Sequence, residues 1–255
     1  MSKREILEKL VSGEISLEEA EERLSSNQIE LVGDFARYDL LREERTGIPE
    51  IIYSETKSPE AVYSIAKKVL EKKPIVLLSR IREEHVKEIQ KLADYYKLEY
   101  GTNKHFCRIM HKDFRPKIDE GKIGIITAGT SDIPVAEEAK AIAEMMGCEA
   151  IIFNDVGVAG IHRLFEPLQK LKKENIDVLI VAAGMEGALP TVVAGLVDIP
   201  VIGLPISTGY GYGGKGQAAL MSMLQSCALG LAVVNIDGGI SAGAIAAKIA
   251  KKRCK

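Results

Sequence analysis

Two segments of the chain carry the residue types of an anion site. Residues 127–134 read Thr-Ala-Gly-Thr-Ser-Asp-Ile-Pro, where small residues leave backbone N–H groups open and the proline suits the first turn of a helix. An ordinary helix cap by Ser131 or Asp132 is the alternative. Further on, His162 and Arg163 could face a phosphate, because a planar guanidinium pairs with two oxygens at once. A solvated helix face is the alternative for that pair.

A carboxylate and a glycine-rich stretch follow. Glu186 lies in the small-residue turn 183–190, at the expected start of a helix. It is either a partner of the helix dipole or a partly desolvated base with a raised pKa. Residues 207–216 read Ser-Thr-Gly-Tyr-Gly-Tyr-Gly-Gly-Lys-Gly, which favours a loop that approaches a ligand or closes over it. It matches no named phosphate motif, and a flexible surface loop is the alternative.

Cys227 is a cysteine whose chemistry depends on its surroundings, because a thiol is reactive only where the environment favours the thiolate. It lies in the stretch 217–228, which predicts a helix with Leu220, Met223 and Leu224 facing a sheet. A cysteine close to such a face is ordinarily a small buried hydrophobe. The spacing alone does not overturn that interpretation.

Each of these groups follows, or lies between, short apolar runs that alternate with helical stretches. The runs are 123–126, 150–153, 178–181, 201–204 and 231–234. Connections of about 12 to 20 residues require crossovers, so we expect an α/β fold with a doubly wound, parallel five-stranded sheet covered on both faces. Ligands of such sheets bind beyond the carboxyl ends of the strands. The chemistry should therefore come from the residues just after each run.

The first half of the chain differs from the second in amino-acid composition. It is rich in charge, whereas the second half is rich in Gly, Ala, Val and Ile. We therefore expect a smaller N-terminal α/β domain, residues 1–118, and a nucleotide-binding catalytic domain, residues 119–255. A turn-forming stretch with Pro116 and Gly121 would link them.

Local patterns predict the elements of the first half. A capping box at Ser16 predicts a helix through Leu24. Helices are expected near 59–72 and 82–96, with an apolar strand at 75–78 between them. A polar segment, residues 34–55, precedes them.

Composition excludes several classes of protein. A formal net charge of -2 gives no field that would gather nucleic acid. Cysteines 107, 148, 227 and 254 share no CxxC spacing, and no His lies close enough to them to suggest a zinc site, so no metal site is expected. The charged start lacks the apolar core of a signal peptide, and no run reaches the ~20 apolar residues of a membrane span. We expect a cytoplasmic protein with reduced thiols.

The second half resembles the carboxylase and mutase that acts on aminoimidazole ribonucleotide in purine synthesis. The matching strings are Gly129-Thr-Ser-Asp132, His162-Arg163, Ala182-Ala-Gly184, Leu189-Pro190 and Gly203-Leu-Pro205. The chain departs from that enzyme, which resembles a single domain and usually has Ala-His where Gly187-Ala188 stands here. The purine enzyme also lacks the Tyr-Gly-Tyr-Gly-Gly-Lys insertion.

A closer resemblance extends over both halves of the chain. Long, uncommon strings match in order, namely Gly13-Glu-Ile-Ser16, Arg45-Thr-Gly-Ile-Pro-Glu50, Asn154-Asp-Val-Gly157, Gly184-Met-Glu-Gly187, Gly209-Tyr-Gly-Tyr-Gly-Gly214 and Gln225-Ser-Cys227. On these strings the chain is identified as similar to the nickel-pincer-nucleotide carboxylase and hydrolase family (LarB type, pyridinium-3,5-biscarboxylic acid mononucleotide synthase).

That resemblance implies a reaction and an assembly. The substrates would be nicotinic acid adenine dinucleotide and CO2 or bicarbonate, and the products AMP and the first intermediate towards the nickel cofactor of lactate racemase. The core would have the flavodoxin-like strand order 2-1-3-4-5, and the subunits would form a homo-oligomer, an octamer. No tightly bound cofactor is implied, and Mg²⁺ is the candidate for neutralising phosphate charge during hydrolysis.

The resemblance also implies roles for individual residues. Cys227 would form a covalent adduct with the pyridinium ring, and Glu186, or else Asp155, would remove a proton. The nucleotide would bind at Gly129, Thr130, Ser131, Asp132, His162, Arg163, Gly184, Met185, Gly213, Gly214 and Lys215. Arg45 and Glu50 would either complete the site or brace the domain interface.

Two other functions stay open at this point. The chain could be a purine-pathway carboxylase or mutase, which leaves Cys227 without a role. It could also be a nucleotide-sensing protein of the same fold without turnover, since fold alone does not decide function.

Overall fold

The computed structural model describes residues 3–26, 29–118 and 121–253. Cys254 and the boundary expected between residues 118 and 119 lie at or beyond the edges of these ranges. Within the described ranges, no helix is both long and apolar enough to cross a membrane.

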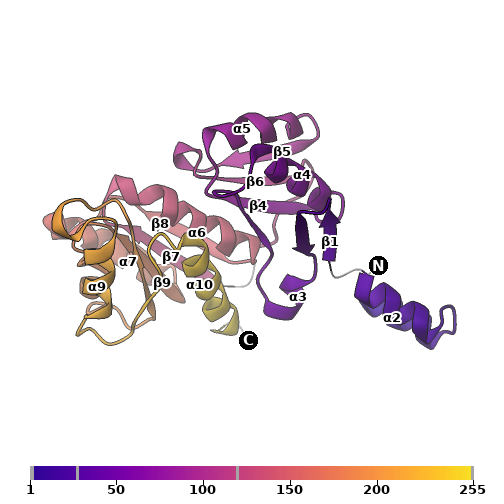
Figure 1. The fold of residues 1–255 in the computed structure, drawn as a ribbon. Helices are drawn as coiled ribbons and strands as arrows, with labels where there is room; N and C mark the ends of the chain where they lie inside the picture. The colour runs from indigo at the N-terminus through magenta and orange to yellow at the C-terminus, as the bar shows by residue number, and fades with distance from the viewer. Residues whose placement is uncertain (1–2, 27–28, 119–120, 254–255) are drawn as a thin grey trace.

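The chain begins with a pair of short helices, α1 (Lys3–Val11) and α2 (Leu17–Ser26). The predicted cap is confirmed, because the backbone N–H of Glu19 donates to Ser16 Oγ at 3.1 Å. Ile6, Ile15 and Ala20 form a small core between the two helices. Figure 1 shows this pair lying apart from the four-stranded and five-stranded sheets of the rest of the chain.

The N-terminal domain is built around a mixed four-stranded sheet in the order β3-β4-β6-β5. Strand β3 is parallel to β4, whereas β4–β6 and β5–β6 are antiparallel. Its elements are the β1–β2 hairpin (Ile29–Val32 and Ala36–Asp39), α3 (Arg42–Thr46), β3 (Ile51–Tyr53), α4 (Pro59–Leu70), β4 (Ile75–Ser79), α5 (Glu83–Ile89), β5 (Tyr96–Tyr100) and β6 (Phe106–His111).

The predicted strand at 75–78 and the helix near 59–72 are confirmed as β4 and α4. The helix expected at 82–96 is shorter, since α5 ends at Ile89 and only a 3-10 turn, Gln90–Leu92, continues it. The sequence reasoning missed β5 and β6. Strand β5 has alternating apolar and charged residues, whereas β6 is buried along most of its length with Arg108 in its middle.

The C-terminal domain holds five parallel strands in the order β11-β10-β9-β7-β8. Numbered along the domain, this is the expected order 2-1-3-4-5, so the doubly wound, flavodoxin-like fold is confirmed. The strands are β7 (Lys122–Thr127), β8 (Glu149–Phe153), β9 (Val178–Ala183), β10 (Val201–Pro205) and β11 (Leu231–Val233). The helices are α6 (Ile133–Met145), α7 (Phe165–Lys173), α8 (Leu189–Ala194), α9 (Gln217–Leu224) and α10 (Gly239–Arg253).

Helices cover both faces of this sheet because the central strands are apolar on both sides. In β9, Val178 and Ile180 belong to the core that includes α6 and α10, whereas Leu179 and Val181 belong to the core under α7, α8 and α9. Because all five strands are parallel, the loops that follow them emerge at the same edge of the sheet.

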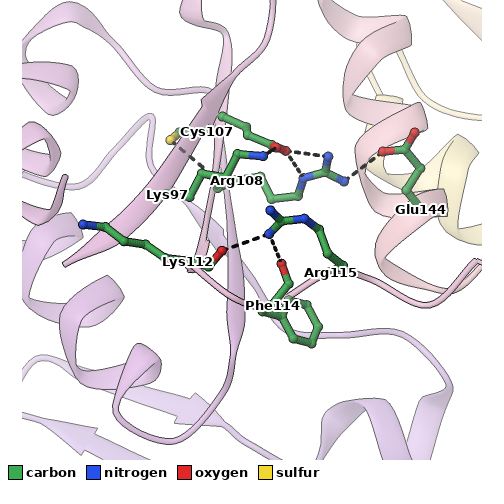
Figure 2. Close-up of polar contacts among 8 residues, drawn as sticks. Lys97, Cys107, Arg108, Lys112, Phe114, Arg115 and Glu144 are labelled. Carbon is green, nitrogen blue, oxygen red and sulfur yellow. Dashed lines mark hydrogen bonds and ion pairs between the residues drawn. The ribbon is translucent and has the colours of Figure 1, made fainter. Parts of the chain in front are cut away.

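Helix α6 lies between the two domains (Figure 1). Leu77 and Phe106 of the N-terminal sheet pack into the same core as α6. Arg108 of β6 forms an ion pair with Glu144 of α6 at 2.9 Å (Figure 2). The domains thus share an apolar contact with charges at its border.

Candidate functional site

The carboxyl ends of β7 and β8 are joined by Thr127. Its hydroxyl donates to Asn154 Oδ1 at 3.2 Å and accepts from the backbone N–H of Asp155 at 3.1 Å. The segments predicted to bind the nucleotide after these two strands therefore lie side by side.

Asp132 closes the first of these segments. Residues Thr130–Asp132 form a 3-10 turn, and the Asp132 carboxylate accepts from the backbone N–H of Gly129 at 2.8 Å. The side chain is buried, and this burial raises the pKa of its carboxyl group. Asp132 thus holds the turn before α6 rather than capping α6 by a side-chain hydrogen bond, while Thr130 and Ser131 stay exposed.

Arg163 and Asp155 form an ion pair after β8. Arg163 Nη1 lies 2.9 Å from Asp155 Oδ2, and both side chains are exposed, as is His162. The pairing leaves further guanidinium N–H groups directed to solvent for an anion, and it makes Asp155 a less available base than an unpaired carboxylate.

The turn after β9 carries Glu186 in an exposed position. Helix α8 begins only at Leu189, so Glu186 precedes it rather than lying in its first turn. Of the two alternatives for Glu186, the desolvated one is not seen in a single chain, because the residue is exposed. The turn itself is tightly packed, because a Cβ at Gly187 (φ +64) would lie 2.6 Å from the backbone of Ala219.

The glycine-rich loop lies against this turn. A Cβ at Gly209 would come within 3.3 Å of the Met185 backbone, and one at Gly184 would lie 2.5 Å from Thr208 Oγ1. Thr208 Oγ1 in turn donates to Asp132 Oδ1 at 3.4 Å. The loops after β7, β9 and β10 therefore interlock, and the exposed Tyr210 and Tyr212 project from them.

Asp237 is a member of this edge that sequence reasoning missed. It follows β11, and its Oδ1 accepts from the backbone N–H of Ser207 at 2.9 Å. The rule that ligand residues follow the strands could have found it, had it been applied to the fifth strand.

Backbone strain gathers at the same edge. The loops that follow β8, β9, β10 and β11 each hold one non-glycine residue in the left-handed region, namely Asp155, Met185, Lys215 and Asp237. Such conformations cost on the order of 1 kcal/mol each and concentrate at functional sites. This observation supports the edge as the site.

Cys227 is exposed and stands apart from these loops. The predicted helix ends at Leu224, not Ala228, and Leu224 is 66% exposed rather than packed on the sheet. Strand β11 pairs Leu231 with Val201, the first residue of β10. Cys227 therefore lies towards the amino edge, beyond an eight-residue helix that spans about 12 Å. Its interpretation as a buried core residue is wrong.

The segment around Cys227 is ordered by its own hydrogen bonds. Ser226 Oγ accepts from Thr191 Oγ1 at 3.0 Å and from the backbone N–H of Ala228 at 3.1 Å. Exposed apolar side chains flank it, since Met221 is 68% and Leu229 93% exposed. The thiol thus sits on an accessible, apolar surface.

Within the described ranges, no three His, Cys, Asp or Glu side chains gather into a metal-binding group.

The chain matches two family models. Residues 122–254 match the AIR carboxylase model, and residues 29–111 match the LarB/PurE-like N-terminal domain. An uncharacterised protein of Methanocaldococcus jannaschii is 44% identical over 97% of this chain and 96% of its own length.

Purine enzymes match the second half alone. The N5-carboxyaminoimidazole ribonucleotide mutase of Thermotoga maritima is 32% identical over 50% of this chain and 74% of its own length. The mutase of M. jannaschii is 36% identical over 50% of this chain and 77% of its own length. Since a LarB-type N-terminal domain precedes the AIR carboxylase domain, the chain belongs to the LarB family of carboxylase-type proteins.

Proposed function

We propose that the protein carboxylates the pyridinium ring of nicotinic acid adenine dinucleotide and hydrolyses its phosphoanhydride. The products are pyridinium-3,5-biscarboxylic acid mononucleotide and AMP, which makes the protein a transferase and hydrolase of nickel-pincer cofactor synthesis. The observation that carries the proposal is the exposure of Cys227 in a chain of this family. A purine carboxylase gives that thiol no role.

The chemistry requires a nucleophile because a pyridinium ring is too electron-poor to attack CO2. The Cys227 thiolate adds to the ring carbon para to nitrogen, and the electrons move onto nitrogen to give a neutral dihydropyridine. This adduct is an enamine, and its free meta carbon attacks CO2 to form the new carbon–carbon bond. The ring nitrogen is then an iminium.

The adduct must next lose a proton. Glu186 takes it from the meta carbon, which restores the enamine, and the nitrogen lone pair then expels the thiolate from the para carbon. The pyridinium is regenerated with one added carboxylate, and Cys227 returns unchanged. No external oxidant, biotin or ATP is consumed.

The positions of the groups indicate a shared site. Glu186 lies at the carboxyl edge, whereas Cys227 lies beyond the far end of α9. We therefore propose that the homo-oligomer, an octamer, supplies Cys227 of one subunit to the edge of another. The apolar residues beside Cys227, Met221 and Leu229, would be covered in that assembly.

The nucleotide is assigned to the edge itself. The exposed backbone at Thr130 and Ser131, with His162 and Arg163 beside it, offers donors to a phosphate. We assign the ring end of the nucleotide to Gly184, Met185 and the glycine-rich loop with Gly213, Gly214 and Lys215. The loop packs on the turn after β9 through Gly209, against the Met185 backbone, and through Thr208, against Gly184. This packing supports a preformed wall for the ligand.

One experiment separates the candidate functions. The protein is mixed with nicotinic acid adenine dinucleotide and bicarbonate, and AMP and a carboxylated mononucleotide are sought by mass spectrometry. Both products are expected. Turnover of aminoimidazole ribonucleotide instead would make the protein a purine carboxylase, and binding of nucleotide without turnover of either would make it a sensor.

A further inference from the structure

Arg80 joins the two domains through one side chain. It follows β4, and its Nη1 lies 3.2 Å from Glu55 Oε2 while the guanidinium lies 5.4 Å from the centre of the Tyr53 ring. Its Nη2 donates to the backbone carbonyl of Asp237 at 3.1 Å. The N-terminal domain thus contacts the segment that follows β11.

The same segment holds both ends of the glycine-rich loop. The Asp237 carboxylate receives the N–H of Ser207, where the loop begins. At the loop's end, a Cβ on Gly216 (φ +77) would lie 2.7 Å from Ile236 Cγ2, so the loop rests there. Asp237 itself has φ 54, a conformation that needs support from its surroundings.

A buried side chain, Glu138, contacts the backbone of Arg80. Glu138 of α6 is fully buried, and its Oε1 accepts from Ser79 Oγ at 2.6 Å and from the Arg80 N–H at 3.4 Å. Arg80 has φ 51, again in the left-handed region. The backbone and the side chain of Arg80 are therefore both held, which suits a residue that must keep another element in place.

We propose, building on the function proposed above, that Arg80 is a positioning residue for the glycine-rich loop. It holds the turn 235–237 by the carbonyl of Asp237, and this turn holds residues 207–216 over the nucleotide site. Arg80 itself touches no substrate. The N-terminal domain thereby sets the position of the loop.

The competing explanation is that Arg80 only helps to hold the two domains together. Arg108 provides the matched control. Arg108 also crosses the domain interface, with Glu99 at 2.7 Å on its own side and Glu144 at 2.9 Å on α6 (Figure 2). Glu144 lies in the last turn of α6, at the opposite end from the loops. Loss of either arginine weakens the interface, but only loss of Arg80 should free the loop.

The loop offers two direct readouts. The chain contains no tryptophan, so Tyr212→Trp, at a fully exposed loop position, gives a single tryptophan that can be excited apart from the tyrosines. Lys215 is an exposed trypsin site in the same loop. In this background we expect Arg80→Gln to lower the anisotropy of the Trp and to speed cleavage after Lys215 by about tenfold.

The controls decide the meaning of that result. Arg108→Gln should leave both readouts at the wild-type values, and Arg80→Lys, which keeps a donor for Asp237, should return most of the anisotropy. Glu55→Gln releases Arg80 from an exposed partner without touching the core, and it should move both readouts in the same direction by less. Circular dichroism verifies that each variant is folded.

Equal changes in the Arg80 and Arg108 variants, or no change in the folded Arg80 and Glu55 variants, would overturn the proposal. These readouts need no substrate. A loosened loop in a protein that fails to carboxylate nicotinic acid adenine dinucleotide therefore keeps the positioning role and removes only the proposed reaction.

Discussion

The carboxyl edge of the C-terminal sheet and the interface between the domains hold charge in opposite ways. At the edge, Asp155, Glu186 and Lys215 are exposed. At the interface, Glu138 is fully buried, and Arg108 keeps only 16% of its side chain exposed between two carboxylates. The interface therefore buries or pairs its ionisable groups, whereas the edge keeps Glu186 and Lys215 exposed to a ligand and pairs Asp155 with Arg163 at the surface.

The largest difference is expected between substitutions of an exposed and of a buried cysteine. Cys227→Ser should leave the free energy of unfolding nearly unchanged, because the side chain is exposed, and should lower carboxylation by about a thousandfold or more. Cys148→Ser, at a fully buried position, should do the reverse and destabilise by about 1–2 kcal/mol with turnover retained. Urea unfolding and product formation measure both. Normal carboxylation by the Cys227 variant would remove the thiol from the mechanism.

Glu186→Gln tests the exposed carboxylate of the edge. Gln keeps the shape but accepts no proton at neutral pH, so carboxylation should fall about a hundredfold while nucleotide affinity changes little. Glu166→Gln, another exposed glutamate, on α7, is the control and should retain activity. Near-normal turnover in the Glu186 variant would shift the base role to Asp155 or to water.

For the buried Glu138 at the domain interface, the test is how the free energy of unfolding depends on pH. Burial raises the pKa of its carboxyl group from 4.5 to about 7. The folded protein therefore binds this proton more tightly than the unfolded chain, and the resulting stability is lost as pH rises from about 4.5 through 7. Since one pKa unit is worth about 1.4 kcal/mol, the loss is about 3 kcal/mol.

Glu138→Gln should remove that pH dependence. Gln stays neutral, so the variant should match the wild type near pH 5 and exceed its unfolding free energy by about 2–3 kcal/mol at pH 8. Urea unfolding at the two pH values measures the difference, with the exposed Glu22→Gln as control. Parallel pH profiles for wild type and Glu138→Gln would show that folding does not raise the pKa of Glu138.

The smallest effect is expected for Arg163→Ala. Loss of a guanidinium that donates to phosphate should weaken nucleotide binding about tenfold, with the fold intact because Arg163 is exposed. Calorimetry measures the affinity, and Lys172→Ala on the neighbouring α7 provides a charge-matched control. Equal affinities for wild type and the Arg163 variant would place the phosphate elsewhere.

Sequence reasoning recovered the C-terminal sheet because each of its strands is an apolar run between turn residues. It missed β6, where Arg108 interrupts the pattern in order to reach Glu144 on another domain. It also misplaced the end of α9, because Gln225 to Ala228 contain no Gly or Pro to signal a stop. The exposure of Cys227 follows from that end and was not predictable from spacing.

The contacts within the edge were equally hidden from sequence. Asp132 and Thr208 are 76 residues apart and meet only through the strand order. The order of the strands and the residues after them could be predicted, but which of these residues bond to each other could not. The division at residue 118 stays a prediction.

The covalent role of Cys227 is tested most directly by the adduct itself. Wild-type protein is mixed with NAD, whose ring already carries a carboxamide, in the absence of bicarbonate, and the ultraviolet spectrum is recorded beside that of Cys227→Ser. The account predicts a dihydropyridine band with the wild type, absent from the Ser variant, and sulfur-to-ring density in a crystal of the complex. A bound nucleotide with neither the band nor the density would contradict it.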